Sequence, residues 1–280
     1  MSVYSLPSTD INEIKAEDPQ AIFAYICPVL DHILLAPATT DDSGKTVFPS
    51  LDFKVHSAVY TLIYNATTTV RAANSKSLYD LIGARIAEDV QKISKTIDDI
   101  AAGEQLVSTY LTAWNRFDRN ATYIDRLTAY LNRHYVKREE DEGKGAKIIL
   151  TTWGYPADGV TKEQAEMCSK ASSGDEALVP TRPLALRKWR MLVVEKLKMG
   201  LVAEHLKTLE GTEKERIAEE LRKSFWTVGV EPAKPQIKAL EEYLPKAPEP
   251  VKPEVTEKAK EPEAAATVEP VAEASSSLEG

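Results

Sequence analysis

The sequence predicts an all-α protein. Apolar residues recur at spacings of three and four from about residue 19 to residue 244, which is the period of an amphipathic helix. Residues typical of helix termini flank several of these segments, such as Asp18 and Pro19 at a start and Gly103 at an end. No two segments combine two-residue alternation with turn residues in the way that predicts paired strands.

The first two predicted helices flank a connecting loop. The first helix follows Pro19, and Pro28 inside it is expected to kink it or split it. Residues 36–52 contain two prolines and a glycine and are predicted to be the loop. The second helix begins near Phe53 and is apolar on two sides. One side carries His56, Val59, Tyr60 and Ile63, and another carries Ala58, Leu62 and Ala66.

Three more helices are predicted before residue 142. An apolar stripe from Leu78 to Ile100 marks the third, and Gly103 is expected to end it. The fourth and fifth follow, with the start of the fifth expected near Asn120. Their apolar positions are Leu106, Tyr110, Trp114 and Phe117 in the fourth, and Ile124, Leu127, Leu131 and Tyr135 in the fifth.

The second half of the chain has a different composition. Residues 142–182 are rich in Gly, Ser, Thr and Lys, with a capping box at Thr161 and Gln164 that predicts one short helix. A long helix is expected from Pro183 to Leu209, and a second capping box, Thr212–Glu215, is expected to open the next helix. A short helical piece is predicted near 237–244.

Residues 245–280 are predicted to be a disordered tail. Leu278 is their only Leu, Ile, Phe, Trp or Tyr, and they contain six Pro, eight Glu and four Lys. The tail contributes half of the formal net charge of −8, and the remaining acidic balance of residues 1–244 argues against a general nucleic-acid binder. The predicted parts are an N-terminal flexible segment (1–18), a first bundle (19–146), an insertion-like loop segment (147–182), further helices (183–244) and the tail.

No motif for catalysis, a metal or a cofactor is recognisable in the sequence. The four His and two Cys have no ligand spacing, and GKG at 143–145 lacks the length and the following Ser or Thr of a phosphate loop. No apolar run is long enough to span a membrane, and the N-terminus does not have the pattern of a signal peptide. The sequence therefore predicts a protein that is not an enzyme and that lies in the cytoplasm, the nucleus or both.

Two stretches of the sequence resemble the cullin family. VHSAVYTLIYNATTTV (55–70) and AYLNRHYVKREEDEGKG (129–145) resemble the second and fifth helices of the first cullin repeat of the cullin-1 type. A weaker likeness extends over 184–230. The residues that carry the likeness in 129–145 are Ala129, Tyr130, Leu131, Asn132, Arg133, His134, Val136, Arg138, Glu139, Asp141, Glu142 and Gly143.

The resemblance implies a ubiquitin-ligase scaffold. The expected fold is a cullin-repeat-like helical bundle, with a five-helix first repeat in 19–146 and a partial second repeat in 183–244. In the cullin-1 type, the tip of the first repeat binds a Skp-type adaptor with its F-box protein, and a C-terminal domain holds a RING subunit. Because the likeness stops early in the second repeat, the expected function is adaptor binding without RING recruitment, as a competitor or regulator of cullin–RING ligases.

The resemblance places the adaptor site on the second and fifth helices. Periodicity alone favours the core for the face that includes His56, whereas the resemblance favours a partner for part of it. His56 stands where cullin-1 types carry an adaptor-facing aromatic residue. The candidate adaptor-binding residues are His56, Val59, Tyr60, Ile63, Asn132, Tyr135 and Val136.

Two alternatives remain open at this stage. The chain could be a helical structural or assembly protein that keeps the repeat fold without adaptor binding. The helices in 184–228 carry strong apolar stripes that include Trp189 and Phe225. They are expected to fold back on the first repeat, to form a homodimer, or to expose an interaction patch.

Overall fold

The computed structural model describes residues 10–35, 39–40, 46–47, 51–68, 72–156 and 159–244. They belong to one unit, Met1–Pro245, which is separate from Lys246–Gly280. The predicted disordered tail and most of the predicted N-terminal flexible segment lie outside the described residues.

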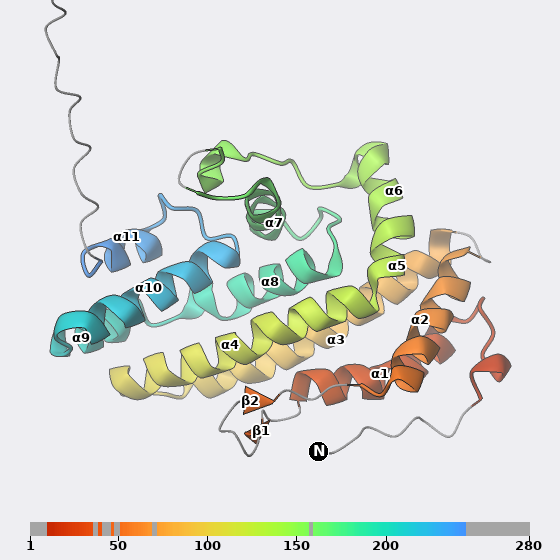
Figure 1. The fold of residues 1–280 in the computed structure, drawn as a ribbon, viewed down its shortest axis with the longest axis horizontal. Helices are drawn as coiled ribbons and strands as arrows, with labels where there is room; N and C mark the ends of the chain where they lie inside the picture. Colours follow the sequence, from red (N-terminus) through yellow and green to blue (C-terminus); the bar gives the residue numbers. More distant parts are fainter. Residues whose placement is uncertain are drawn as a thin grey trace, which may run out of the picture. The chain divides into compact units, whose positions relative to one another are not determined.

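The described part of the chain is helical apart from one short ribbon (Figure 1). Its helices are α1 (Pro19–Leu35), α2 (Phe53–Thr68), α3 (Ala72–Asp98), α4 (Gly103–Leu127), α5 (Ala129–Leu131), α6 (Lys137–Glu139), α7 (Lys162–Ser172), α8 (Thr181–Leu192), α9 (Met199–Thr208), α10 (Gly211–Thr227) and α11 (Pro235–Glu241). Two-residue strands β1 (Thr39–Thr40) and β2 (Thr46–Val47) pair antiparallel. The predicted all-α fold class is confirmed.

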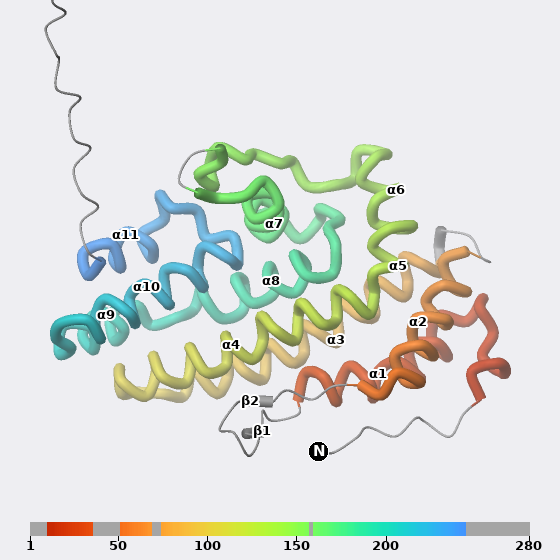
Figure 2. The backbone as a smooth tube through the Cα atoms, viewed as in Figure 1, coloured from red at the N-terminus to blue at the C-terminus, as the bar shows by residue number. Residues whose placement is uncertain are grey.

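The long helices α3 and α4 run through the middle of the unit (Figure 2). Helix α1 packs against both of them on one side, and α8 packs against both on the other. Helix α9 continues the contact with α4, and α7 and α10 lie beyond α8. Helix α2 packs against α1, α3 and α5 and therefore lies at one end of the bundle.

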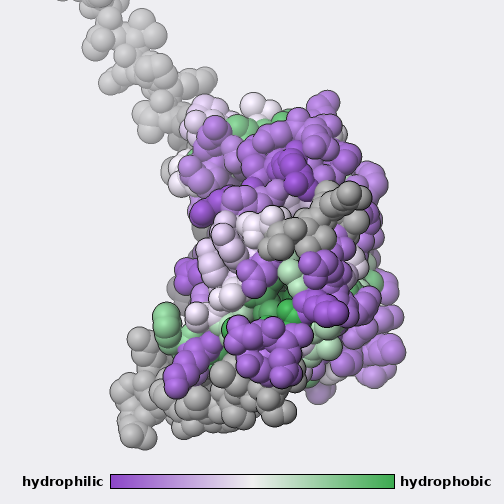
Figure 3. All heavy atoms as spheres, turned by 90° about the vertical axis from the view of Figure 1, so that its right-hand side faces the viewer, coloured by the Kyte–Doolittle hydropathy of each residue, from purple (hydrophilic) through white to green (hydrophobic). Residues whose placement is uncertain are grey.

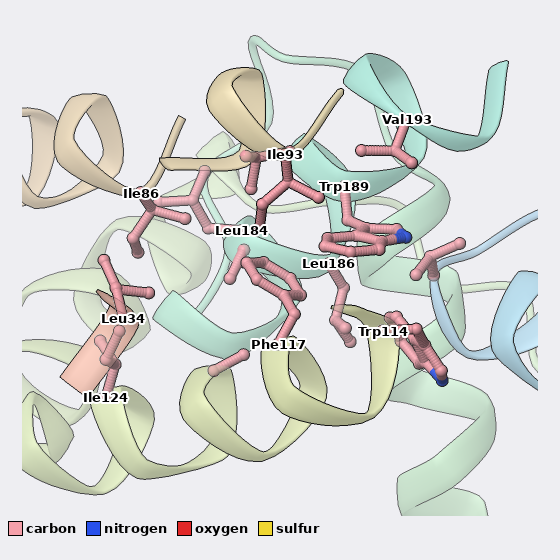
Figure 4. Packing of buried hydrophobic residues seen from close by; sticks show 14 of the residues in the cluster. Leu34, Ile86, Ile93, Trp114, Phe117, Ile124, Leu184, Leu186, Trp189 and Val193 are labelled. Atoms are coloured by element: carbon pink, nitrogen blue, oxygen red, sulfur yellow. The ribbon is translucent and has the colours of Figure 1, made fainter. Parts of the chain in front are cut away.

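Aromatic side chains hold α8 to α4 (Figure 4). The ring of Trp189 on α8 stacks on Phe117 of α4 with a centroid distance of 4.6 Å, and Trp114 lies 5.7 Å from it. Tyr110 packs edge-on against Trp189 and Phe225. These rings, here called the buried cluster, are at most 7% exposed. The apolar stripes that suggested a homodimer therefore fold back on the same chain.

Several helix boundaries differ from the predicted ones. Asn120 does not start a helix, because α4 continues through it and ends at Leu127. The apolar spacing of Phe117, Ala121 and Ile124 is unbroken there, and all three side chains are buried. The predicted helix 183–209 is also divided, since a 3-10 turn at Val194–Lys196 separates α8 from α9.

The structure decides two further points: the split considered at Pro28 does not occur, and one predicted capping box does not form. Helix α1 is not split at Pro28: it is a single helix from Pro19 to Leu35, with Ile26, Val29 and Leu30 fully buried around the proline. Burial of these side chains offsets the loss of one backbone hydrogen bond at the proline. The capping box expected at Thr212–Glu215 does not form, because α10 begins at Gly211 without a side-chain cap.

The capping box at Thr161 and Gln164 is confirmed at the start of α7. The Thr161 hydroxyl accepts a hydrogen bond from the Gln164 backbone N–H, and the Gln164 side-chain oxygen accepts one from the Thr161 backbone N–H. Helix α7 packs against α8 and α10. Its buried residues Ala165 and Cys168 form a small second core with Trp153. Residues 147–182 thus contribute packed structure to the unit.

Candidate functional site

An aromatic surface lies at the end of the bundle where α2 meets α5. Tyr60 and Tyr64 of α2 pack edge-on against Tyr130 of α5, with ring centroids 5.6 Å and 4.7 Å apart. Tyr130 also stacks on His134, at 4.2 Å and an interplanar angle of 25°. We call these four residues the aromatic face. Figure 3 shows this side of the molecule, where hydrophobic residues reach the surface among hydrophilic ones.

The spacing of these residues explains how the face forms. Tyr60 and Tyr64 are four residues apart on α2, and Tyr130 and His134 are four apart on the facing helical stretch. Residues at this spacing lie one above the other on a helix surface. The other sides of α2 are anchored in the core, where Val59 and Ile63 are fully buried. The tyrosines are thereby directed outward.

The aromatic side chains of this region differ in solvent exposure. Tyr60 is 38% exposed and Tyr64 42% exposed, while Phe53 at the start of α2 is 83% exposed. Partial burial raises the pKa of the Tyr130 phenol, the adjacent Tyr64 and Tyr60 add to the increase, and the charge of Arg133 opposes it. The phenol hydroxyls of Tyr64, Tyr60 and Tyr130 therefore lie near one another and near Arg133.

A π-helical turn at Asn132–Val136 carries His134 of the aromatic face. The Asn132 side-chain amide donates to Asp125 at 2.9 Å and to the Thr181 hydroxyl at 3.1 Å, and its carbonyl accepts from the Thr181 backbone amide. The turn is thereby fixed to α8. Such turns are rare and occur often at functional sites. The helical stretch ends at Lys144, just after Gly143 adopts a left-handed conformation with φ of 88°.

The structure places most of the predicted adaptor-binding residues in the core. Four of them are 4% exposed or less and present no surface to a partner: Val59, Ile63, Tyr135 and Val136. Tyr135 packs against Tyr79 of α3 instead. Asn132 is partly buried and uses its amide inside the protein. Tyr60 is exposed, and His56 is partly buried on the same helix.

The physical reason is that the aliphatic residues on both apolar sides of α2 are buried. Ala58, Leu62 and Ala66 pack into the core together with Val59 and Ile63, so that only Tyr60 and the partly buried His56 of these sides reach the surface. The sequence reasoning omitted Phe53, Tyr64, Tyr130 and His134 from the candidate site. A signal was present, since aromatic residues recurred at four-residue spacing outside the apolar stripe in both helices.

The described residues offer no cluster of metal ligands and no activated thiol at Cys168. They contain no group of three or more His, Cys, Asp or Glu side chains that could hold a metal ion. Burial raises the pKa of the Cys168 thiol to about 12, which disfavours the reactive thiolate. None of the helices described is long and apolar enough to cross a membrane.

A cavity of about 420 Å³ lies between α3, α8 and the loop before α8, and its charged groups hold that loop. Fully buried Arg187 donates to the carbonyl oxygens of Gly174 and Ala177, at 2.6 Å and 2.9 Å. Lys188 pairs with Asp175 at 2.6 Å. These groups are already used in protein contacts that hold the loop on α8.

The fold is that of a helical scaffold domain with an exposed aromatic face at one end. Residues 50–233 match the family model described as the cullin alpha solenoid domain. This match covers more than half of the chain, and the protein belongs to the cullin family. The matched region contains α2 to α10, and so includes the aromatic face.

Individual cullins are similar to parts of this chain. The chain is 24% identical to Cell division control protein 53 of Saccharomyces cerevisiae over 155 residues, which are 50% of this chain and 19% of that protein. It is 45% identical to Cullin-1 of Caenorhabditis elegans over 42 residues, 15% of this chain and 5% of that protein. With Cullin-1 of Dictyostelium discoideum it shares 29% identity over 69 residues, 25% and 9% of the two chains. The chain thus matches less than one fifth of the length of each relative.

Proposed function

We propose that this protein is a non-catalytic scaffold of the ubiquitin-ligase system that binds a Skp-type adaptor together with its F-box protein. The observation that carries the proposal is the aromatic face. It is formed by α2 and the helical stretch 129–144, the two segments on which the cullin resemblance places the adaptor site. The proposed contacts lie on the same two segments, but they are made by the exposed residues of these segments and not by the buried ones.

The side chains of the exposed side suit a protein interface. Tyr and Phe are among the residues that contribute most when an interface buries them, because they bring large area with few rotatable bonds. Tyr60, Tyr64 and Tyr130 already pack against one another, so binding orders them less than it would order separate side chains. Phe53, at 83% exposure, adds an anchor that the fold itself leaves unburied.

We further propose that adaptor binding makes the protein a competitor or regulator of cullin–RING ligases. The described unit can occupy an adaptor through one end of the bundle, and another cullin would need the same adaptor surface. We propose that residues 1–280 do so without recruiting a RING subunit. A pull-down with a RING-box subunit, in the presence and absence of adaptor, measures this part separately. Co-purification of the RING-box subunit would refute it.

Calorimetric titration of the full chain with a Skp-type adaptor–F-box complex tests the proposed function. We expect a Kd in the micromolar range or tighter, and a loss of ~1 kcal/mol or more for Phe53→Ala and for Tyr64→Ala, as for interface anchors. Tyr243→Ala is the matched control, because Tyr243 lies near α11 at the other end of the bundle. It should leave the Kd unchanged.

Failure of the folded protein to bind at about 50 micromolar would refute adaptor binding. The far-ultraviolet circular dichroism spectrum and a cooperative melting transition establish that the protein is folded. In that case the alternative applies, namely a helical structural or assembly protein that retains the cullin repeat. Equal loss of binding in the Tyr243 control would place the contact outside the aromatic face.

A further inference from the structure

The two segments that form the aromatic face lack acidic residues. Residues 53–68, the whole of α2, contain no Asp or Glu, and neither do residues 126–138. The same segments contain Lys54, Arg126, Arg133, Lys137 and Arg138. The chain as a whole has 43 Asp and Glu against 35 Lys and Arg. The two segments that carry the aromatic face are therefore positively charged in a protein whose net charge is negative.

Two of the three arginines among these cations have no ion-pair partner within the described part of the chain. Arg126 and Arg133 are exposed, and neither forms an ion pair or hydrogen bond with a described residue. Several other arginines are paired with carboxylates, such as Arg85 with Asp31 and Arg222 with Glu219. An arginine left unpaired beside exposed aromatic rings is available to a carboxylate from another molecule.

Two carboxylates of α4, Asp125 and Asp118, are already engaged. Asp125 accepts hydrogen bonds from Asn132, from the Thr181 hydroxyl and from the Arg182 backbone amide. Asp118 pairs with the Arg182 side chain at 3.0 Å. Both acids are therefore used in contacts with α8, and they are not paired with Arg126 or Arg133.

The tyrosine hydroxyls supply neutral hydrogen-bond donors near the unpaired guanidinium of Arg133. The hydroxyls of Tyr60, Tyr64 and Tyr130 have no hydrogen-bond partner among the described residues, although their rings pack together. Phenol hydroxyls donate readily to carboxylate oxygens, and hydrogen bonds to an ionised acceptor are about twice as strong as neutral ones. The face thus combines aromatic area, hydroxyl donors and guanidinium groups.

We propose that the aromatic face recognises an acidic segment of the adaptor, whose carboxylates pair with Arg133 and Arg126 while its apolar residues cover the tyrosine rings. This inference rests on the proposed function and specifies the chemistry of the partner surface. The net negative charge of the chain repels an acidic partner in most orientations, whereas the end that carries α2 and α5 attracts it. Such a distribution raises the association rate and selects the binding orientation.

The association rate of the full chain with a Skp-type adaptor–F-box complex, measured at low salt and at about 0.5 M salt, tests the inference. We expect the wild-type rate constant to fall roughly tenfold or more at high salt. At low salt, Arg126→Glu combined with Arg133→Glu should lower it by a similar factor. Arg133→Lys should keep most of the rate because it keeps the charge.

Lys207→Glu is the matched control, because Lys207 is an exposed residue of α9 with no ion pair to a described residue. It makes the same charge change away from α2 and α5 and should alter the rate less than twofold. Since Arg126 and Arg133 are exposed and unpaired, the glutamate variants should melt at the wild-type temperature. Arg133→Gln provides a milder second variant if they do not.

The outcomes separate this inference from the proposed function. Wild-type binding that is independent of salt and of Arg126 and Arg133 would overturn the acidic-segment inference and leave adaptor binding intact. Equal rate losses in the Lys207→Glu control would attribute the effect to net charge and would also overturn it. Absence of wild-type binding would refute both proposals together.

Discussion

The buried cluster around Trp189 and the aromatic face around Tyr130 contain similar ring contacts in opposite surroundings. Centroid distances are 4.6–6.0 Å in the former and 4.2–5.6 Å in the latter. The buried rings continue the apolar stripes of α4, α8 and α10 and lie inside the bundle, whereas Tyr60 and Tyr64 of α2 are 38% and 42% exposed. Ring packing alone therefore does not identify core, and the solvent exposure of the rings does.

The largest expected contrast between the two regions is in stability. Trp189→Ala removes a fully buried ring that touches Phe117, Trp114 and Tyr110, and it should lower the free energy of unfolding by ~4 kcal/mol. Tyr64→Ala should cost less than ~1 kcal/mol, because that ring is 42% exposed. Urea denaturation of both variants measures the difference. Similar losses would mean that the aromatic face is part of the core.

Asn132→Ala should have an intermediate effect on stability and a second effect on binding. It removes the hydrogen bonds that connect the π-helical turn to Asp125 and Thr181, and we expect a loss of ~2 kcal/mol in the free energy of unfolding. Because the turn positions His134 against Tyr130, adaptor binding should weaken as well. Denaturation and calorimetry on one preparation measure both quantities.

A suitable control for Asn132 is Thr161→Ala, which removes the cap of α7 away from the face. It should cost ~1 kcal/mol of stability and leave adaptor binding unchanged. If both variants weakened binding equally, global destabilisation would explain the effect of Asn132→Ala, and the turn would have no positioning role.

The sequence predicted where the helices lie in the chain better than it predicted which of their residues are exposed. The periodicity that defines α2 and α4 depends on residues close together in the chain, so these helices could be predicted directly. Asn120 was misplaced as a helix start because a polar side chain suggested a boundary, whereas it is 5% exposed inside α4.

The candidate site was harder to predict because exposure depends on contacts between distant segments. The sequence showed that α2 has two apolar sides, but the pattern could not show that α5 and the central helices bury both. For the same reason Tyr135 and Val136 looked available to a partner, although α3 covers Tyr135. The resemblance pointed to α2 and the stretch 129–144, and the structure shows which of their residues are exposed.

A smaller effect concerns the response of buried tyrosines to pH. Burial raises the pKa of Tyr79 to about 12, against an unfolded value near 10. The folded state therefore favours the neutral phenol, and this contribution is complete below pH 10 and is lost as the pH rises toward 12. By about pH 11 the free energy of unfolding should fall by ~1 kcal/mol on this account.

Urea denaturation of the wild type and of Tyr79→Phe between about pH 9 and pH 11 measures this loss, and the variant should show a shallower decline. Tyr64→Phe is the control on the aromatic face, and its decline should match the wild type. An equal decline in the wild type and Tyr79→Phe would show that other groups produce the alkaline loss.

The finest contrast compares one hydroxyl in each region. Tyr110 donates to the Ser224 hydroxyl at 2.9 Å, since that hydroxyl itself donates to the Leu221 carbonyl. Tyr110→Phe should therefore cost ~1 kcal/mol, because it leaves a buried acceptor without its donor. Tyr130→Phe should change stability by less than ~0.5 kcal/mol, since its hydroxyl has no partner among the described residues. If Tyr130→Phe weakens adaptor binding without lowering stability, the hydroxyl contacts the partner and does not support the fold. If the variant changes neither adaptor affinity nor stability, only the ring of Tyr130 contributes to the aromatic face.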